Sequence, residues 1–583
     1  MKKSKNILIA SLTILLSVYS CDSTFFDLDK EPLNLISDAF VFVDEALVDA
    51  NLAQIYHLTL FNYIGGDDPV WDFLESGMGA EGRGFALWQV NAWVPLEIMD
   101  EGGAPGPIDY WPYNNIRNAN EFIIGVQNGE FSQDFKDQRI SEARYLRAHM
   151  YFQMVKRYGG VPIITEPQPI DAPEDVLFVS RNSEQEVYDF IASEMDAIAL
   201  ILPEVTETGR VCKYTALSLK SRAMLYAASA AEFGSVQMDG LLGIPAGQAS
   251  NYWQASYDAS MEIISSGNYS LYNNFPDDPA WNFQDLFVEE GNNPERIFVE
   301  VYDFTVAKGH SWNLGATPNE FALEWGSNYC PFLHIVDEFQ YADGSPGKID
   351  RDLINSGHLF HIDEIFRNRD PRFLATFFFP ESEFRGGVVR FHRATIVDGE
   401  EVTSGTIVDD WPAAAPRRNW INTGFLVRKR IDEGETGTGR GTSNTDYMVF
   451  RYGEILLNIA EAAYYLDRTG EALEYINLIR DRAGMPSLTS VTEDDIRQER
   501  RVELAYEDHR FWDLRRWRVA HEELDGLRTQ GLQYFYHYEE DKYELRLINA
   551  EGTSRVFQER HYYFPLGVNR IAENPNMVEN PGY

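Results

Sequence analysis

Residues 452–479 decide the fold, and they read YGEILLNIAEAAYYLDRTGEALEYINLI. In the first half, apolar residues recur at the spacing of one face of an α-helix. This stripe consists of Tyr452, Ile455, Leu456, Ile459, Ala460 and Ala463. Thr469 and Gly470 supply a turn, and the return stripe consists of Ala472, Ile476 and Ile479. Because alanines at a helix contact allow close approach, the stretch predicts two antiparallel helices joined by a short turn.

Similar pairs of helical patterns lie upstream. Residues 141–158 form one pattern that stops at Gly159-Gly160, and residues 182–202 form its partner, which ends at Pro203. A second pair covers residues 214–231 and 252–266. Helix-turn-helix units of this kind are typical of tetratricopeptide-like arrays. We therefore predict a mostly α fold, in which irregularly spaced helix pairs between about 110 and 490 carry long loops and minor β structure.

Three long stretches rich in aromatic residues interrupt the helical patterns, at 60–106, 275–330 and 386–446. Loops of this length in a compact protein are usually functional or disordered, and their tryptophans favour an ordered, functional role. A sugar ring packs its apolar C–H face on an aromatic ring, while its hydroxyls need planar polar partners. Such partners stand nearby at Gln89, Asn91, Asn313 and Asn328.

The aromatic residues of the first two stretches are therefore candidates for an exposed binding patch. The alternative is that they are packing residues, which is the commoner role of tryptophan in a large protein. We expect about two or three of the seven to touch ligand. The candidates are Trp71, Trp88, Trp93, Trp281, Trp312, Trp325 and Tyr329.

The first residues predict a secreted, lipid-anchored protein. A basic segment, Met1 to Lys5, precedes an apolar run of about twelve residues, which is too short to span a bilayer as a helix. Cys21 follows this run directly after Ser20. The pattern resembles a lipoprotein signal, residues 1–20, that leaves a mature chain of 21–583. Acylation of Cys21 would hold that chain at a membrane, since each buried methylene contributes about 0.8 kcal/mol.

Composition excludes some classes of partner. Lys and Arg number 50 and Asp and Glu number 91, so the formal charge is 50 − 91 = −41. A polyanion of this size is repelled by nucleic acid, which removes that partner class. Besides Cys21, the cysteines are Cys212 and Cys330, far apart and without metal-binding spacing. Two buried free thiols are expected there rather than a disulfide.

Motifs for catalysis or metal binding do not stand out. The stretch from His521 to Leu524 lacks the second histidine of a zinc-protease motif, and no nucleophile elbow or phosphate loop occurs. Acidic pairs at Asp67-Asp68 and Asp277-Asp278 offer oxygen ligands for calcium, but neither follows an EF-hand frame. We expect solvated turn carboxylates there, no cofactor, and no enzymatic activity.

Four groups of motifs stand in order along almost the whole mature chain. They are YWPYNNIRNAN at 110–120 with EARYLRA at 142–148 and RYGGVP at 157–162; RDPR at 369–372; RYGEILLN at 451–458 with AEA at 460–462; and ERRVEL at 499–504 with RFWDLRRW at 510–517. Together these segments resemble the SusD/RagB family of nutrient-binding lipoproteins. The resemblance implies a helical, tetratricopeptide-like fold, divided into an N-terminal region at 22–240 and a C-terminal region at 280–583. It also implies a surface position on the outer membrane, over a TonB-dependent transporter of the SusC type. The arginines and acids of the last segment, among them Arg500 and Glu503, are expected to form structural ion pairs.

Three functions follow as hypotheses. The first is a surface lipoprotein that binds oligo- or polysaccharide and delivers it to the transporter. The second keeps the fold and location but binds peptides, as the RagB-like branch does. The third, a secreted glycoside hydrolase, requires a pair of catalytic carboxylates, and no particular pair stands out among 91 acidic residues.

Overall fold

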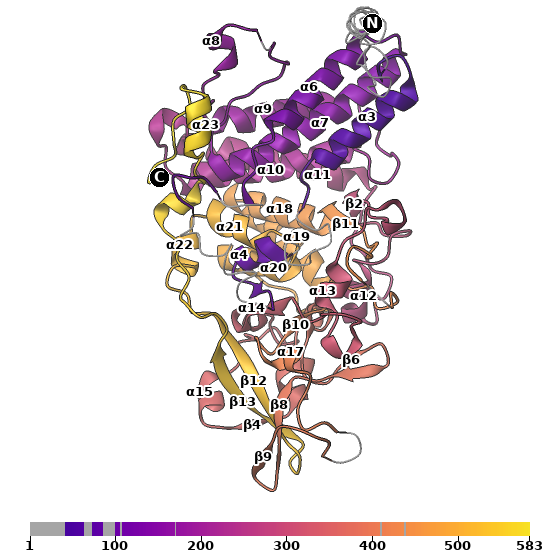
Figure 1. The fold of residues 1–583 in the computed structure, drawn as a ribbon, viewed down its shortest axis with the longest axis vertical. Helices are drawn as coiled ribbons and strands as arrows, with labels where there is room; N and C mark the ends of the chain where they lie inside the picture. Colours follow the sequence, from indigo (N-terminus) through magenta and orange to yellow (C-terminus); the bar gives the residue numbers. More distant parts are fainter. Residues whose placement is uncertain are drawn as a thin grey trace, which may run out of the picture.

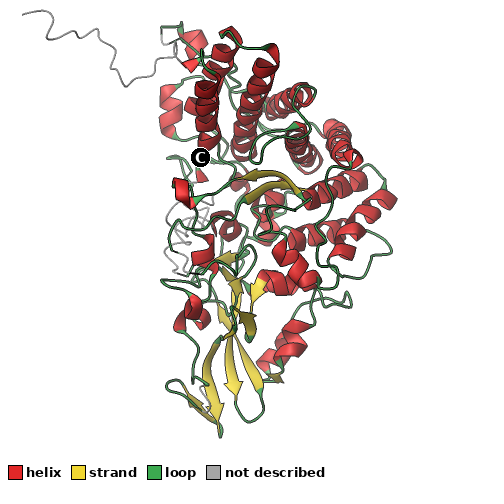
Figure 2. Cartoon of the chain, turned by 90° about the vertical axis from the view of Figure 1, so that its right-hand side faces the viewer, coloured by secondary structure: helices red, strands yellow, loops and turns green. Residues whose placement is uncertain are grey.

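The computed structural model describes residues 41–62, 73–85, 99–104, 108–169, 171–407, 411–436 and 439–583. Cys21, Trp71, Trp88 and Trp93 lie outside these ranges, so the predictions made for them remain predictions. The chain has a helical upper half and a mixed lower half, at whose far end the strands gather (Figures 1 and 2). None of the helices in the described ranges combines the length and the apolar character that a bilayer crossing requires.

Among the described residues, nine longer helices form the upper half and the centre of the molecule (Figure 1). Neighbours along the chain pack against each other from α6 to α7, α7 to α9, α9 to α10, α10 to α11, α11 to α18 and α18 to α19. This confirms the predicted mostly helical fold built from tetratricopeptide-like pairs. The helices are α3 (Glu45–Leu58), α6 (Tyr113–Asn128), α7 (Gln133–Tyr158), α9 (Glu184–Ala199), α10 (Lys213–Phe233), α11 (Ala249–Ser266), α18 (Tyr452–Tyr465), α19 (Thr469–Arg482) and α20 (Glu493–Glu503).

Local sequence explains the helix ends and contacts. Ser183 caps α9 in a reciprocal pairing with Glu186, which satisfies backbone N–H groups that the first turn leaves open. Helix α7 begins eight residues earlier than its predicted start at 141, because Ser132 accepts a hydrogen bond from the Phe135 backbone as its cap. Small residues bring α10 close to α11, where the hydroxyls of Ser221 and Ser260 lie 2.8 Å apart.

A buried network of arginines and carboxylates ties the central helices together. Glu503 at the end of α20 is 0% exposed and pairs with Arg372 at 2.9 Å, with Arg451 at 2.8 Å and with Arg482. Burial alone would raise the pKa of Glu503, but the arginines hold it well below its usual range. We call the following residues the buried ion network: Glu295, Asp370, Arg372, Arg451, Arg480, Arg482, Glu499, Glu503 and Glu507.

The expected structural role of the charged segment at 499–517 is confirmed. Arg500 is fully buried and donates to Asp513 at 2.7 Å, and Arg516 donates to the same carboxylate at 2.8 Å. Both cysteines of the described chain are also as predicted, since Cys212 and Cys330 are buried free thiols.

The lower half ends in a five-stranded sheet of order β4-β13-β12-β8-β9. Strands β12 and β13 form a hairpin in which Gln530 pairs with Asn549 and His537 with Lys542. Strand β8 joins β12 in parallel, which requires the long connection between residues 397 and 530. The strands of this sheet are β4 (Leu359–Phe360), β8 (His392–Val397), β9 (Glu400–Val402), β12 (Gln530–His537) and β13 (Lys542–Asn549).

Short elements connect these layers and form the small two-stranded sheets. The short helices include α4 (Leu74–Met78), α8 (Glu174–Leu177), α12 (Pro279–Asp285), α13 (Trp312–Ala316), α14 (Leu333–Glu338), α15 (Arg351–Asn355), α16 (Pro371–Thr376), α17 (Arg417–Trp420), α21 (Arg510–Arg516), α22 (Ala520–Glu523), η9 (Glu559–Tyr562) and α23 (Val568–Glu573). The short strands are β1 (Gly82–Arg83), β2 (Arg296–Glu300), β3 (Cys330–Pro331), β5 (Phe377–Phe378), β6 (Ser382–Phe384), β7 (Gly387–Val389), β10 (Leu426–Val427) and β11 (Tyr447–Arg451).

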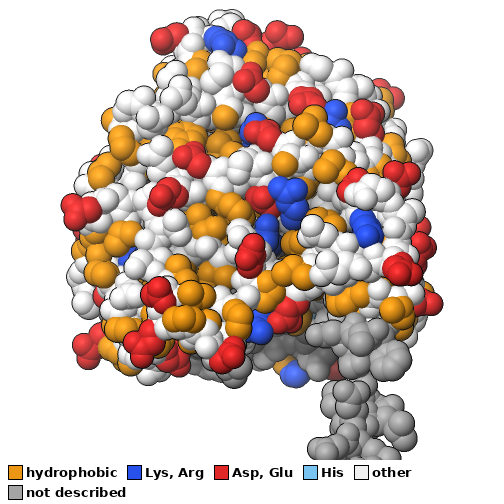
Figure 3. All heavy atoms as spheres, turned by 90° about the horizontal axis from the view of Figure 1, so that it is seen from above, with side chains coloured by type: hydrophobic (Ala, Val, Ile, Leu, Met, Phe, Trp, Pro, Cys, Tyr) orange, Lys and Arg blue, Asp and Glu red, His pale blue; other side chains and the backbone are white. Residues whose placement is uncertain are grey.

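The surface reflects the acidic composition. On the face seen from the helical end, acidic side chains are scattered widely between apolar ones, and basic side chains are few (Figure 3). This distribution agrees with the net charge of −41.

Candidate functional site

The three aromatic-rich stretches meet at one place in the lower half. Strand β1 pairs with β3 antiparallel, with Gly82 opposite Pro331 and Arg83 opposite Cys330. Because the strands run in opposite directions, residues that follow β1 lie beside residues that precede β3. Phe85 and Asn328 therefore emerge at the same end of this ribbon. The first stretch and the second are joined here by backbone pairing.

Arg418, from the third stretch, contacts residues of both of the other stretches at this ribbon end. Its guanidinium carbon lies 3.7 Å from the centre of the Phe85 ring. The same group donates to the Asn328 side-chain oxygen at 3.0 Å and to the Gly326 carbonyl at 2.9 Å. Burial lowers the pKa of Arg418 from its ordinary value, although a guanidinium stays charged at neutral pH. One planar cation thus touches both of the other stretches.

Trp325 and Arg440 complete the arrangement. The guanidinium carbon of Arg440 lies 4.0 Å from the centre of the Trp325 ring, and Asn328 donates to the Trp325 carbonyl at 2.7 Å. The Trp325 side chain is half-buried and Arg440 is exposed, so both remain accessible to a ligand. We name the five residues Phe85, Trp325, Asn328, Arg418 and Arg440 the aromatic junction.

Two of the predicted platform residues belong to the interior instead. Trp312 and Tyr329 are each 1% exposed, with ring centres 4.7 Å apart. The Trp312 indole N–H donates to the Lys429 carbonyl at 2.9 Å, and Tyr329 also stacks on Phe73. The prediction that these two rings form part of an exposed patch is therefore wrong, because both rings fill the core beneath the junction. Asn313, expected beside them as a hydrogen-bond partner, is likewise buried.

Trp281 lies on another element. It is 38% exposed on α12, and its ring packs edge-on against Phe275, which is 40% exposed. The side chain of Asp278 accepts a hydrogen bond from the Trp281 backbone and caps this helix. One carboxylate of the acidic pair at 277–278 therefore serves as a helix cap.

Three residues of the junction were not among the sequence candidates, namely Phe85, Arg418 and Arg440. Phe85 and Arg418 lie inside two of the stretches identified as functional loops, and Arg440 lies in a glycine-rich segment of the third. Sequence order alone does not indicate which arginine lies over which ring, because the pairs are separated by more than a hundred residues in the chain. The signal in the sequence that could have pointed to these residues was the presence of arginines within the aromatic-rich stretches.

A buried carboxyl lies beside the ribbon that carries the junction. Glu81 precedes β1, is 1% exposed, and has one carboxyl oxygen with no hydrogen-bond partner among the described residues. Burial raises its pKa to about 7, although Arg501 and Arg510 oppose the shift. The folded protein therefore holds a proton on Glu81 that the unfolded chain releases near pH 4.5.

The pH dependence of this group has a definite sign. As the pH rises from 4.5 to about 7, the unfolded chain loses the Glu81 proton first, so stability falls. We expect Glu81→Gln to be about 3 kcal/mol more stable than the parent at pH 8 and nearly equal to it at pH 4.5. Urea unfolding at the two pH values measures this difference. Glu324→Gln, at an exposed position, is the control and should show no such change; an equal effect of Glu81→Gln at both pH values would contradict the assignment.

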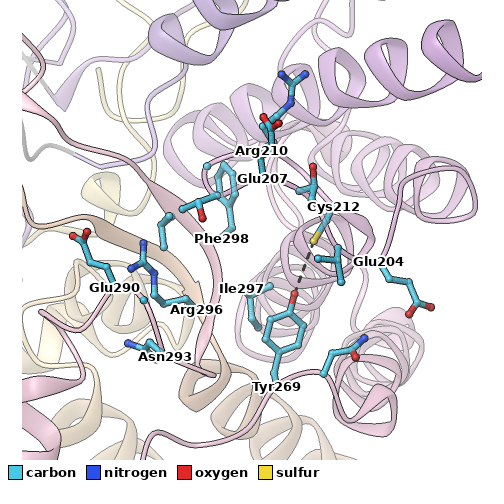
Figure 4. Close-up of a pocket in the computed structure, with 17 residues that line it drawn as sticks. Glu204, Glu207, Arg210, Cys212, Tyr269, Glu290, Asn293, Arg296, Ile297 and Phe298 are labelled. Atoms are coloured by element: carbon cyan, nitrogen blue, oxygen red, sulfur yellow. Dashed lines mark hydrogen bonds between the residues drawn. The ribbon is translucent and has the colours of Figure 1, made fainter. Parts of the chain in front are cut away.

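A pocket of about 330 Å³ opens between the segment before α10, the turn after α11 and strand β2 (Figure 4). Figure 4 shows the Cys212 thiol facing the Tyr269 hydroxyl, at 3.9 Å. The rings in its wall serve packing, since Tyr269 lies edge-on to Tyr214 and Phe298 lies edge-on to Phe61. Its arginines are engaged as well, because Arg210 pairs with Glu142 and Arg296 with Asp446. The aromatic junction is therefore the better candidate for ligand recognition.

The described residues hold no cluster of three or more His, Cys, Asp or Glu side chains arranged to bind a metal ion. The other acidic pair considered for calcium, Asp67-Asp68, lies outside the described residues.

Comparison with known proteins agrees with this architecture. A family model described as "SusD family" matches residues 294–583, and one described as "Starch-binding associating with outer membrane" matches residues 96–225. A SusD-like protein of Bacteroides ovatus is 23% identical over 99% of this chain and 97% of its own length.

Solved structures show the same fold. A SusD-like protein of Bacteroides fragilis superposes with a TM-score of 0.72 at 24% identity, over 95% of this chain and 100% of the other. A SusD-like carbohydrate-binding protein of the same species superposes with a TM-score of 0.68 at 23% identity, over 92% and 100%.

Proposed function

Because the chain belongs to the SusD family, we propose that it binds a glycan at the aromatic junction. The observation that carries the proposal is the convergence of Phe85, Trp325 and two guanidiniums from three separate stretches. A pyranose ring offers an apolar C–H face to an aromatic ring and hydroxyls to planar donors. The junction supplies both kinds of partner within one small area. A structural relative described as carbohydrate-binding supports the same ligand class.

Four of the five junction residues have specific roles in this proposal. The half-buried Trp325 ring offers the surface on which a sugar packs, and Arg440 presents N–H groups to its hydroxyls. Arg418 and Asn328 hold the ribbon end in place through their mutual hydrogen bond. Binding rather than catalysis is proposed, so the purified protein should leave its polysaccharide uncleaved; release of new reducing ends would contradict this.

The proposal extends to location and partner. The basic segment, the apolar run and Cys21 support anchoring by lipid at the cell surface, and one matching family is described as associating with the outer membrane. We propose that the protein passes its glycan to a TonB-dependent transporter of the SusC type. Co-purification of such a transporter with a tagged, membrane-anchored protein tests this step. The lipid anchor is tested by comparing the parent with the Cys21→Ala variant. A membrane-bound parent and a soluble variant would support it.

Affinity gel electrophoresis tests the ligand class directly. The purified protein is run through gels that each contain one neutral or acidic polysaccharide, with serum albumin as the unretarded reference. We expect retardation by at least one polysaccharide. If no glycan retards the protein while peptides bind in solution, the peptide-binding alternative replaces this proposal.

Arg440 provides a graded test of the junction. Arg440→Ala should weaken binding of the retarding glycan by about fivefold, because the hydrogen bonds that its guanidinium is proposed to donate to the sugar hydroxyls contribute about 1 kcal/mol. Arg440→Lys should recover only part of this loss, since lysine lacks the planar fork. The matched control is Arg417→Ala, an exposed arginine on α17 beside Arg418. Equal losses in the two alanine variants would indicate general electrostatics rather than a site.

A further inference from the structure

A second cavity, of about 470 Å³, lies at the side of the helical half where the end of the chain returns. The end of α10, the loop after it, the start of α22, helix η9 and the last residues of the chain form its walls. Its volume falls within the range of small-molecule sites, which is about 300–1,000 Å³. The residues that shape it are Phe233, Ser235, Arg518, Arg560, Tyr562 and Tyr563.

The backbone conformation and the side-chain contacts of Arg518 fix its position in this cavity. Its backbone is left-handed, with φ of +58°, a conformation that costs free energy in a non-glycine residue. The guanidinium lies over the rings of Tyr562 and Tyr563, at 4.7 and 4.8 Å from their centres. It donates to the Tyr563 hydroxyl at 2.5 Å, and that hydroxyl donates to Glu184 at 2.7 Å. This hydrogen bond uses one of the five N–H groups of the Arg518 side chain.

The surroundings of Arg518 are positive in a chain that is strongly negative overall. Arg560 lines the cavity, and its Nε is buried without a hydrogen-bond partner among the described residues. Burial, then Arg518 and Arg157, lower the pKa of the neighbouring Arg515 to about 9. The facing carboxylates are Glu184, which is buried and bound by Tyr563 and the Gly243 backbone, and Glu559, which is exposed at the rim.

We propose that this cavity binds a carboxylate-bearing ligand about the size of one sugar ring, such as a uronic acid. Arg518 offers a planar fork that matches a carboxylate in two parallel hydrogen bonds. The Phe233, Tyr562 and Tyr563 rings form an apolar wall for the rest of the ligand. The volume exceeds what a simple inorganic anion needs. The site is distinct from the aromatic junction and does not depend on it.

Calorimetric titration of the full-length protein tests the proposal, with D-glucuronate, D-glucose and sulfate as probes. We expect D-glucuronate to bind, D-glucose to bind much more weakly, and sulfate to compete poorly. Arg518→Gln should weaken glucuronate binding by at least about tenfold, the loss of one charge-assisted pair. Trp281→Ala, at an exposed tryptophan outside both this cavity and the aromatic junction, should leave glucuronate binding unchanged.

A second variant protects the test against misfolding. Ser235 is exposed at the mouth, so Ser235→Trp should block the cavity while leaving the fold intact, and it should abolish glucuronate binding. Absence of glucuronate binding to the parent protein would overturn the proposal. Binding that survives both Arg518→Gln and Ser235→Trp, or sulfate that competes as well as glucuronate, would overturn it too.

Discussion

Replacing Glu503 by glutamine is expected to lower the free energy of unfolding by about 3–5 kcal/mol. Glu503 is 0% exposed and joins Arg372, Arg451 and Arg482, which come from three other segments. In the Glu503→Gln variant, the three buried guanidiniums lose one shared carboxylate. A buried charge without a partner destabilises the folded state. Urea unfolding at pH 7 followed by circular dichroism measures the loss. A value below about 1 kcal/mol would contradict the central role given to this residue.

The matched control is Glu121→Gln on α6, where Glu121 pairs with Arg117 on the surface. Solvent screens such a pair, so its loss should cost less than about 0.5 kcal/mol.

The dependence of stability on acid provides a second check of the role of Glu503. Because the folded pKa of Glu503 is depressed, its stabilisation is complete above the unfolded pKa of about 4.3 and is lost as the pH falls through the folded pKa. The difference between the parent and Glu503→Gln should therefore shrink in strong acid.

Trp325→Ala is expected to weaken glycan binding by about 30-fold, which corresponds to about 2 kcal/mol. The variant removes the ring that Arg440 covers and on which the sugar is proposed to pack. Since Trp325 is only half-buried, the melting temperature should change little. Trp325→Phe should retain part of the affinity, because a smaller ring still offers an apolar face. Titration calorimetry with the retarding glycan measures all three proteins.

Trp281→Ala is the matched control for this prediction. Trp281 is an exposed tryptophan from the same stretch as Trp325, and it packs on Phe275 rather than at the junction. Its loss should leave the affinity for glycan unchanged. Equal weakening by Trp281→Ala and Trp325→Ala would mean that the ligand covers a wider surface, and weakening by Trp281→Ala alone would move the site to α12.

The helix pairs could be predicted from sequence because their determinants are local. The stripes of α18 and α19, the Thr469-Gly470 turn and the capping pair of Ser183 and Glu186 each act within a few residues. The five-stranded sheet could not be placed in this way. Its parallel pairing of β8 with β12 joins segments more than a hundred residues apart, and local pattern does not encode such register.

The sequence indicated which stretches of the chain contain the candidate site, but not which residues form it. Aromatic enrichment drew attention to stretches that meet at the ribbon of β1 and β3, and their role in binding stays a prediction. It did not separate Trp325 from Trp312, although the two lie thirteen positions apart in one stretch. Trp312 is buried because Lys429 accepts its indole hydrogen and Tyr329 covers its ring. Burial of this kind depends on partners distant in sequence, so composition alone cannot reveal it.

The crystal structure of the protein with a bound oligosaccharide tests the central claim most directly. The account predicts a sugar ring packed against Trp325, with hydroxyls hydrogen-bonded to Arg440 or Arg418. A sugar bound only on Trp281, only in the pocket of Figure 4 or only beside Arg518, with the aromatic junction empty, would contradict it.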